Sequence, residues 1–139
     1  MIKSERQKVL ITYADKVISC SGILREDKTI NASYNGQIAA FPVSVAMIGL
    51  IPTIRYYNNP DSKSNINKTK ILEMIDTMYL YDTGNDPSNT QIDKVENLYN
   101  LVGTSRNDVL TRNDVLNRIY EYAIALKQVI RTYKLVKDE

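Results

Sequence analysis

The chain lacks the side chains on which most enzymes depend. Its 139 residues include no histidine, no tryptophan and a single cysteine, Cys20. Without histidine it has neither the commonest general base nor the commonest zinc ligand, and one cysteine cannot form an internal disulfide. The five glycines are isolated from one another, and none belongs to a GxxxxGKS/T or GxGxxG phosphate-binding motif. We therefore expect a binding protein with no catalytic residue, no metal site and no cofactor.

Long apolar runs are also missing. The longest, 38–54, is interrupted by Pro42, Ser44, Gly49 and Pro52, and it is shorter than the roughly 18 residues that a membrane span needs. The N-terminus leads directly into charged side chains, without the apolar core of a signal peptide. We therefore expect no membrane partner and a cytoplasmic location.

Two pairs of carboxylates stand at helical spacing, Glu73 with Asp76 and Asp93 with Glu96. Such pairs can hold a metal ion when histidine or a second matching pair completes the ligand set. Because the chain has no histidine, we expect both pairs to be solvated helix surface.

The composition is that of one globular domain, 1–139, with 43% hydrophobic and 24% charged residues. Apolar residues recur at helical spacing in several segments, and no segment shows the sustained alternation of a strand. The predicted helical segments are Ser4–Ser19, Gln37–Tyr57, Ile71–Tyr79, Ile92–Val102 and Ile119–Tyr133. The polar stretch Arg25–Asn35 predicts a loop. The expected fold class is all-α, a compact single-domain bundle of about five or six helices with a long C-terminal helix.

The segment Gln37–Tyr57 is apolar almost all round, so we expect it at the centre of the domain. Its two prolines indicate breaks. Pro42 predicts the start of a new helix after a short one that ends near Ala40, because proline suits the first turn of a helix. Pro52 predicts a kink in the helix that follows.

The final segment has the clearest helical pattern. Its seam residues step by four, three, four and three positions: Ile119, Ala123, Leu126, Ile130 and Tyr133. Just before it, the sequence of 106–110 is repeated at 112–116, and each copy follows a Ser or Thr that can cap a helix. Helix starts near Ser105 and near Thr111 both fit this pattern.

Charge is divided unevenly along the chain, although the net charge is only +2. Acidic side chains dominate 71–100 and basic side chains dominate 118–137. Lys127, Arg131 and Lys134 are spaced by four and three residues, which predicts one basic stripe on the final helix. Such stripes suit the phosphate backbone of a nucleic acid. From charge clustering we select these candidate binding residues: Arg55, Lys68, Lys70, Lys127, Arg131 and Lys134.

Two segments resemble a known family. The run Tyr34–Tyr57, with its Phe-Pro break at Phe41 and its Gly49-Leu50 pair, resembles the central helix of the small subunit of type III-B (Cmr) CRISPR effector complexes. The run Ala123–Val136 resembles the closing helix of that family. Length and helix order agree over nearly the whole chain.

The resemblance implies a non-catalytic subunit of an antiviral ribonucleoprotein. Several copies would stack beside the backbone that binds the crRNA, and they would line the path of the target RNA. The partners implied are the other subunits of the effector complex, the crRNA and target RNA, and neighbouring copies of the chain. The basic candidates would then be RNA-binding residues that contact phosphates.

Two other readings remain open. A helix-turn-helix DNA-binding regulator would use the segment 105–122 as its reader, although Asp108 and Asp114 would face phosphates badly. A helical protein-interaction adaptor would use the apolar seam of the final helix, and its binding would survive high salt.

Overall fold

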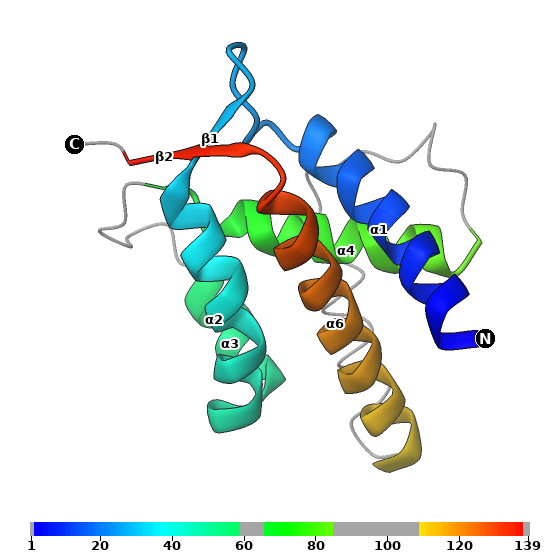
Figure 1. Ribbon diagram of the computed structural model, residues 1–139. Helices are drawn as coiled ribbons and strands as arrows, with labels where there is room; N and C mark the ends of the chain where they lie inside the picture. Colours follow the sequence, from blue (N-terminus) through cyan, green and yellow to red (C-terminus); the bar gives the residue numbers. More distant parts are fainter. Residues whose placement is uncertain (1, 59–65, 85–108, 138–139) are drawn as a thin grey trace.

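The computed structural model describes residues 2–58, 66–84 and 109–137 (Figure 1). Its elements are, in chain order, α1 (Ile2–Cys20), β1 (Thr29–Asn31), α2 (Ala32–Ile48), α3 (Leu50–Tyr57), α4 (Thr69–Asp82), α6 (Val109–Ile130) and β2 (Lys134–Val136). The described residues are mostly helical and their strands are only three residues long, which confirms the predicted all-α class. The helix predicted at 92–102 and the helix start predicted near Ser105 lie outside the described residues.

The helices form a bundle around α6. Helix α6 packs between α1 and α2, and α4 crosses behind it (Figure 1). Helix α3 lies behind α2. The strands β1 and β2 pair in parallel, with Thr29 opposite Lys134 and Asn31 opposite Val136, at the end of the bundle where α2 begins and α6 ends.

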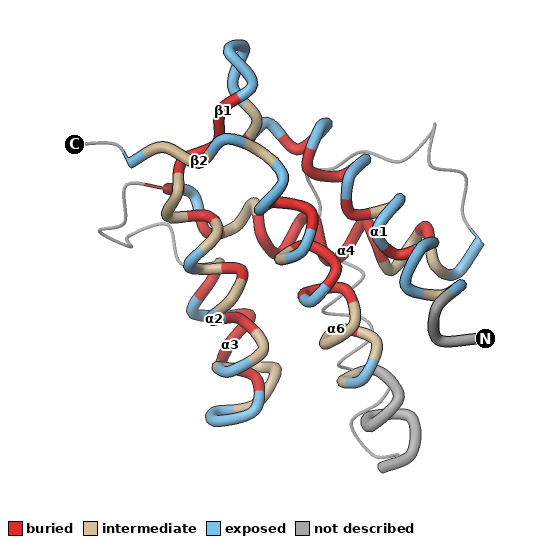
Figure 2. The backbone as a smooth tube through the Cα atoms, viewed as in Figure 1, coloured by how far each residue is buried: buried red, intermediate tan, exposed pale blue. Residues whose placement is uncertain are grey.

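Helix α4 is the most deeply buried of the described helices (Figure 2). Every residue from Ile71 to Met78 is buried, including the polar residues Glu73, Asp76 and Thr77. The helix contacts α1, α2, α3 and α6, so neighbours cover all of its sides. The sequence pattern predicts an amphipathic helix here, with one exposed side. The structure differs because a local pattern does not reveal how many neighbours a helix has.

The expectation that Gln37–Tyr57 lies at the centre is wrong. Ile38, Phe41 and Val45 of α2 are buried, but the opposite side of the same helix is exposed, and Met47 is 79% exposed. An all-round apolar helix is normally covered on all sides. Here α2 lies at the edge of the bundle (Figure 1).

The break in this segment falls at neither proline. Helix α2 runs through Pro42, which costs it one backbone hydrogen bond to the carbonyl of Ile38, and it ends at Ile48. Gly49 then adopts φ 92° and ψ 166°, a conformation essentially restricted to glycine. Pro52 lies in the first turn of α3, where a missing N–H is tolerated. The predicted helix start at Pro42 and the predicted kink at Pro52 are therefore wrong.

The C-terminal helix is confirmed, but it ends earlier than predicted. Helix α6 begins at Val109, so Thr111 lies inside it and does not start it, and it ends at Ile130. The amide of Thr132 donates to the carbonyl of Val129 at 2.9 Å, and the chain then turns into β2. The backbone of β1 offers hydrogen-bond partners about 100 residues away in sequence, a contact that a local pattern cannot reveal.

The predicted loop 25–35 is correct only in its first part. Residues 25–28 form a turn, with Lys28 at φ 67°, and β1 follows. Helix α2 then begins at Ala32, where the side-chain oxygen of Asn31 accepts a hydrogen bond from the amide of Ser33 at 2.9 Å.

Candidate nucleic-acid interface

The structure replaces the predicted basic stripe with a different basic surface. Because α6 ends at Ile130, Lys127, Arg131 and Lys134 do not share one helix, and the predicted helical stripe is wrong. Arg131 lies in the turn after α6, Lys134 begins β2, and both are exposed. Lys127 remains on α6 and is half-buried.

Two further cations lie at the paired strands with Arg131 and Lys134, and strand pairing places one of them there. Lys28 directly precedes Thr29, the β1 residue that pairs with Lys134, and Lys137 directly follows β2. We call these four exposed residues, Lys28, Arg131, Lys134 and Lys137, the basic ribbon. None of the four forms an ion pair within the part of the chain that the structure describes.

Among the described residues, the anions nearest in sequence to Lys28 are Glu26 and Asp27, in the turn before β1. Asp27 Oδ1 accepts hydrogen bonds from the amide of Thr29 at 3.1 Å and from its hydroxyl at 2.6 Å, and these bonds hold the pKa of Asp27 below its usual value. Asp27 therefore stays ionised and fixes the turn. Within the described residues, the four cations of the basic ribbon outnumber these two carboxylates.

The other three sequence candidates lie on α3 and near the start of α4. Arg55 is exposed on α3. Lys68 is buried, and its Nζ donates to Tyr56 Oη at 2.8 Å and lies 4.3 Å from the centre of the Tyr56 ring. Lys70 forms an ion pair with buried Glu73 at 3.3 Å. Of these three, Arg55 alone is exposed, and it forms no ion pair with any residue that the structure describes.

The sequence selection therefore overlaps the basic ribbon only at Arg131 and Lys134. It missed Lys28, which stands in a stretch read as an uninformative loop, and it did not select Lys137. No local signal identifies Lys28, because its proximity to Lys134 depends on a strand pair between distant segments.

A separate cluster of charges joins α1, α4 and α6. The guanidinium of Arg6 donates to Asp82 Oδ1 at 3.1 Å and Oδ2 at 3.0 Å, and to Glu121 Oε2 at 2.8 Å and Oε1 at 3.1 Å. Asp82 also accepts hydrogen bonds from Tyr122 Oη at 2.7 Å and Arg118 at 3.3 Å. All four oxygens of these two carboxylates thus accept hydrogen bonds, and we call this cluster, which links the three helices, the clasp.

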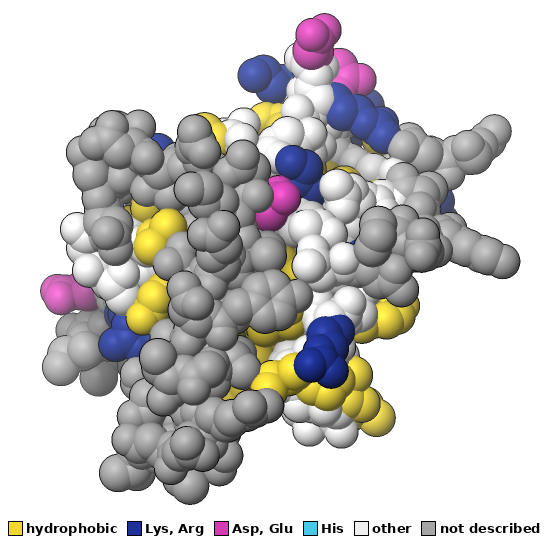
Figure 3. Space-filling view, turned by 180° about the vertical axis from the view of Figure 1, so that it is seen from behind, with side chains coloured by type: hydrophobic (Ala, Val, Ile, Leu, Met, Phe, Trp, Pro, Cys, Tyr) yellow, Lys and Arg dark blue, Asp and Glu magenta, His cyan; other side chains and the backbone are white. Residues whose placement is uncertain are grey.

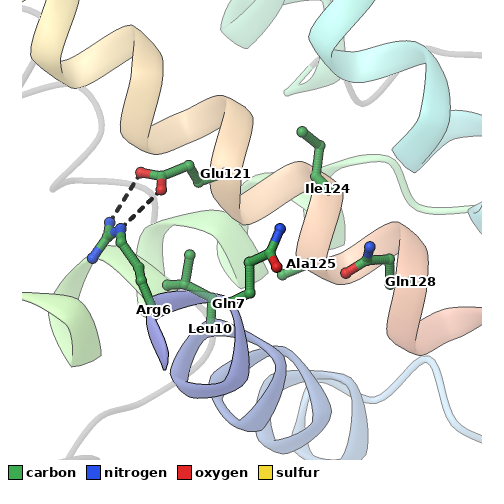
Figure 4. A pocket seen from close by; sticks show the side chains of 7 residues that line it. All are labelled: Arg6, Gln7, Leu10, Glu121, Ile124, Ala125 and Gln128. Carbon is green, nitrogen blue, oxygen red and sulfur yellow. Dashed lines mark hydrogen bonds and ion pairs between the residues drawn. The ribbon is translucent and has the colours of Figure 1, made fainter. Parts of the chain in front are cut away.

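A shallow groove of about 270 Å³ opens beside this clasp, between α1 and α6 (Figure 4). Leu10 and Ala125 line it, the amides of Gln7 and Gln128 flank it, and the Arg6–Glu121 pair lies at one end. Its volume is below the range of ~300–1,000 Å³ usual for small-molecule sites, and its charged groups already bond one another.

The expectation that both carboxylate pairs are solvated helix surface is wrong for Glu73 and Asp76, because neighbouring helices cover α4. Glu73 and Asp76 are buried on α4, and Glu73 is held by Lys70. No group of three or more potential metal ligands occurs among the described residues. Asp93 and Glu96 lie outside them. None of the described helices is both long enough and apolar enough to cross a bilayer.

Seen from behind, hydrophobic side chains gather at the α2–α3 end of the molecule, around a cationic side chain (Figure 3). The exposed residues of these two helices include Met47, Ile48, Arg55 and Tyr56. The molecule thus offers two unlike surfaces, the basic ribbon at one end and an apolar surface on α2 and α3.

Comparison with known proteins adds no relative. No protein-family model matches the chain, and no curated protein and no solved structure matches it either.

Proposed function

We propose that the chain is a non-catalytic small subunit of a type III-B CRISPR ribonucleoprotein effector, present in several copies, that helps to hold guide and target RNA. The observation that carries the RNA-binding part is the basic ribbon, whose four exposed cations form no ion pair within the described chain. Unpaired, solvent-facing cations can displace the counterions of a phosphate backbone.

The assignment to the effector complex rests on the resemblance, and the quoted residues have clear structural roles. Phe41 is buried and packs edge-on against Tyr57, with the ring centres 5.1 Å apart. Gly49 adopts the conformation that separates α2 from α3, and Leu50 packs against the core. A Cβ on Gly49 would meet only Pro52 Cδ, at 3.7 Å, so backbone conformation and not close helix packing explains this glycine.

The test is binding of single-stranded RNA, measured by fluorescence anisotropy between about 50 and 200 mM salt. We expect affinity to fall as salt rises. The charge reversals Lys28→Glu and Lys134→Glu should weaken binding, and removal of one phosphate-binding cation should reduce the slope of log K against log salt by about 0.7. Helical circular dichroism should be unchanged, because both side chains are exposed.

The matched control is Lys8→Glu, an equal change of charge at an exposed position on α1, away from the basic ribbon. If Lys8→Glu weakens RNA binding as much as Lys134→Glu, net charge alone determines the affinity and the basic ribbon is not the site. Lys68→Ala should leave RNA binding intact, because the Lys68 ammonium is occupied by Tyr56. Failure of the tagged chain to co-purify with a CRISPR ribonucleoprotein from its own host would contradict membership of the complex.

A second candidate function, a helical protein-interaction adaptor, is favoured by the exposed apolar residues of α2. The helix-turn-helix reading has less support, because α6 is one continuous helix from Val109 to Ile130. The exposed side chains described on α6 are Asn117, Ile124 and Gln128, so it presents no exposed cation there to a DNA groove.

A further inference from the structure

Helix α2 carries a second apolar face on the side opposite the core. Gly36, Ala40, Val43 and Met47 are all exposed and step by four, three and four residues. At 100° per residue they fall within about 60° of one another around the helix. We call these four residues the outer seam. The buried residues Tyr34, Ile38, Phe41 and Val45 lie about 160° away around the same helix.

The outer seam stands on a rigid support. Tyr57 of α3 donates from Oη to the carbonyl of Gln37 at 3.0 Å, and burial raises the pKa of Tyr57 to about 12, so this hydroxyl stays protonated. The hydroxyls of Ser44 and Thr53 share a hydrogen bond of 2.9 Å. These contacts hold α2 against α3 without using any residue of the outer seam, so the seam is free to meet a partner.

The order of side-chain sizes along the outer seam is self-complementary. Two small residues, Gly36 and Ala40, are followed by two larger ones, Val43 and Met47. If two copies of α2 pack antiparallel about a two-fold axis between positions 41 and 42, Gly36 meets Met47 of the other copy and Ala40 meets Val43. Small residues then face large ones at every layer, which is the arrangement that fills a helix interface. A parallel pair would leave a gap at Gly36 and crowd two Met47 side chains.

Charge also permits a second copy at this face. No charged residue occurs between Thr29 and Ile54, a stretch that contains the whole of α2. Two copies that each carry a net charge of +2 can therefore bring their outer seams together without placing like charges in contact. In contrast, the basic ribbon would repel its own copy.

We propose that the outer seam of α2 is the contact of a symmetric homodimer, in which two α2 helices pack antiparallel. This inference does not rest on the proposed role in RNA binding. Because the seam occupies one 17-residue helix, the interface is small and we expect a weak, concentration-dependent dimer.

Sedimentation equilibrium over a range of protein concentrations tests self-association directly. We expect a monomer–dimer equilibrium that persists at high salt, and Met47→Glu or Val43→Glu should weaken it at least ~10-fold by placing a charge in the contact. The control is Ile11→Glu, the same type of change at an exposed apolar residue of α1. A chain that stays monomeric up to about 1 mM, or a dimer that Ile11→Glu disrupts and Met47→Glu does not, would overturn the proposal.

A second variant distinguishes a shape-complementary contact at the outer seam from nonspecific hydrophobic association. Gly36→Leu enlarges the exposed apolar surface, and a Cβ at Gly36 meets nothing within 4 Å in the monomer. A nonspecific apolar surface would therefore associate more strongly. The proposed contact should instead weaken by ~10-fold or more, because the leucine occupies the space of Met47 from the other copy. Stronger association of Gly36→Leu would contradict a shape-complementary contact at the outer seam.

Disulfide cross-linking tests the antiparallel arrangement, in a Cys20→Ser background because Cys20 is exposed. A mixture of Ala40→Cys and Val43→Cys chains should form a mixed disulfide dimer. Gly36→Cys alone should not cross-link, because the two copies of position 36 would lie roughly 16 Å apart along the axis. Efficient cross-linking of Gly36→Cys with itself would indicate parallel helices and would overturn the proposal.

Discussion

At the scale of single residues, Asp82 links three helices, because it accepts hydrogen bonds from one residue of α1 and two of α6. It lies at the end of α4, its side chain is only 8% exposed, and it accepts hydrogen bonds from Arg6, Arg118 and Tyr122. Burial by itself would raise its pKa, but the hydrogen bonds from Arg6 and Tyr122 and the charges of Arg6 and Arg118 outweigh this, and the pKa of Asp82 is lowered. The pKa of Arg6 is raised in turn, chiefly by its hydrogen bonds to Glu121 and Asp82.

Asp82→Asn should destabilise the fold by about 1–3 kcal/mol at neutral pH, since the donors around it would face a neutral acceptor in place of a charged one, and Arg6 and Arg118 are themselves partly solvated. The native pKa of Asp82 is below the value of about 3.9 in the unfolded chain, so its contribution is fully present above that value and is lost as pH falls through the native pKa. Urea unfolding followed by circular dichroism at pH 7 and in acid measures both effects.

Glu26→Gln serves as the control for this experiment, because Glu26 is an exposed carboxylate outside the clasp. It should change the free energy of unfolding by less than about 0.5 kcal/mol. If the difference between wild type and Asp82→Asn is as large in acid as at neutral pH, ionisation of Asp82 is not what stabilises the clasp.

At the scale of elements, the division of one apolar segment into α2 and α3 depends on Gly49. The residue lies at φ 92° and ψ 166°, and its carbonyl accepts a hydrogen bond from the hydroxyl of Thr53 at 2.7 Å, which closes the first turn of α3. The two prolines of the segment fit inside the helices on either side. The helix therefore ends at a glycine, which can adopt this backbone conformation. Neither proline ends it, although proline cannot donate a backbone hydrogen bond.

Gly49→Ala should lower the free energy of unfolding by about 1–3 kcal/mol, the usual cost of a forbidden backbone conformation. The strain is in the backbone, because the new Cβ would make only an ordinary contact with Pro52. Gly36→Ala is the matched control. It is a helical glycine with open space around it, so the same change should stabilise α2 by up to about 1 kcal/mol. Thermal unfolding at low protein concentration compares them, and equal effects would contradict this account of the break.

At the scale of the whole molecule, α4 is the centre and the two candidate interfaces lie outside it. Buried residues of α1, α2, α3 and α6 pack around α4 in one hydrophobic cluster. Neither the basic ribbon nor the outer seam contributes a residue to that cluster. Changes in either surface should therefore alter binding without unfolding the protein, which makes the two proposals separable by experiment.

Amide hydrogen exchange should identify α4 as the most protected helix among those described. Amides of Leu72–Met78 should exchange most slowly, because exposing them requires the surrounding helices to separate, whereas the eight-residue α3 should exchange faster. Exchange followed by mass spectrometry gives the order. Faster exchange in α4 than in α3 would show that burial of α4 does not control global opening.

The sequence by itself determined the helical class, the positions of α1, α4 and most of α6, and the Ile119, Ala123, Leu126 and Ile130 seam, because 3.6-residue periodicity is a local property of the chain. The basic residues selected from the sequence overlap the basic ribbon only at Arg131 and Lys134, and their role in RNA binding stays a prediction.

Only the tertiary structure decided which helix is central, where α6 ends and which cations meet. Both α2 and α4 carry apolar side chains that favour burial. However, α4 has neighbours on every side and α2 does not. Lys28 reaches Lys134 only because β1 pairs with β2 across most of the chain, and Lys68 is buried against Tyr56. Such outcomes depend on contacts between distant residues, which no window of sequence contains.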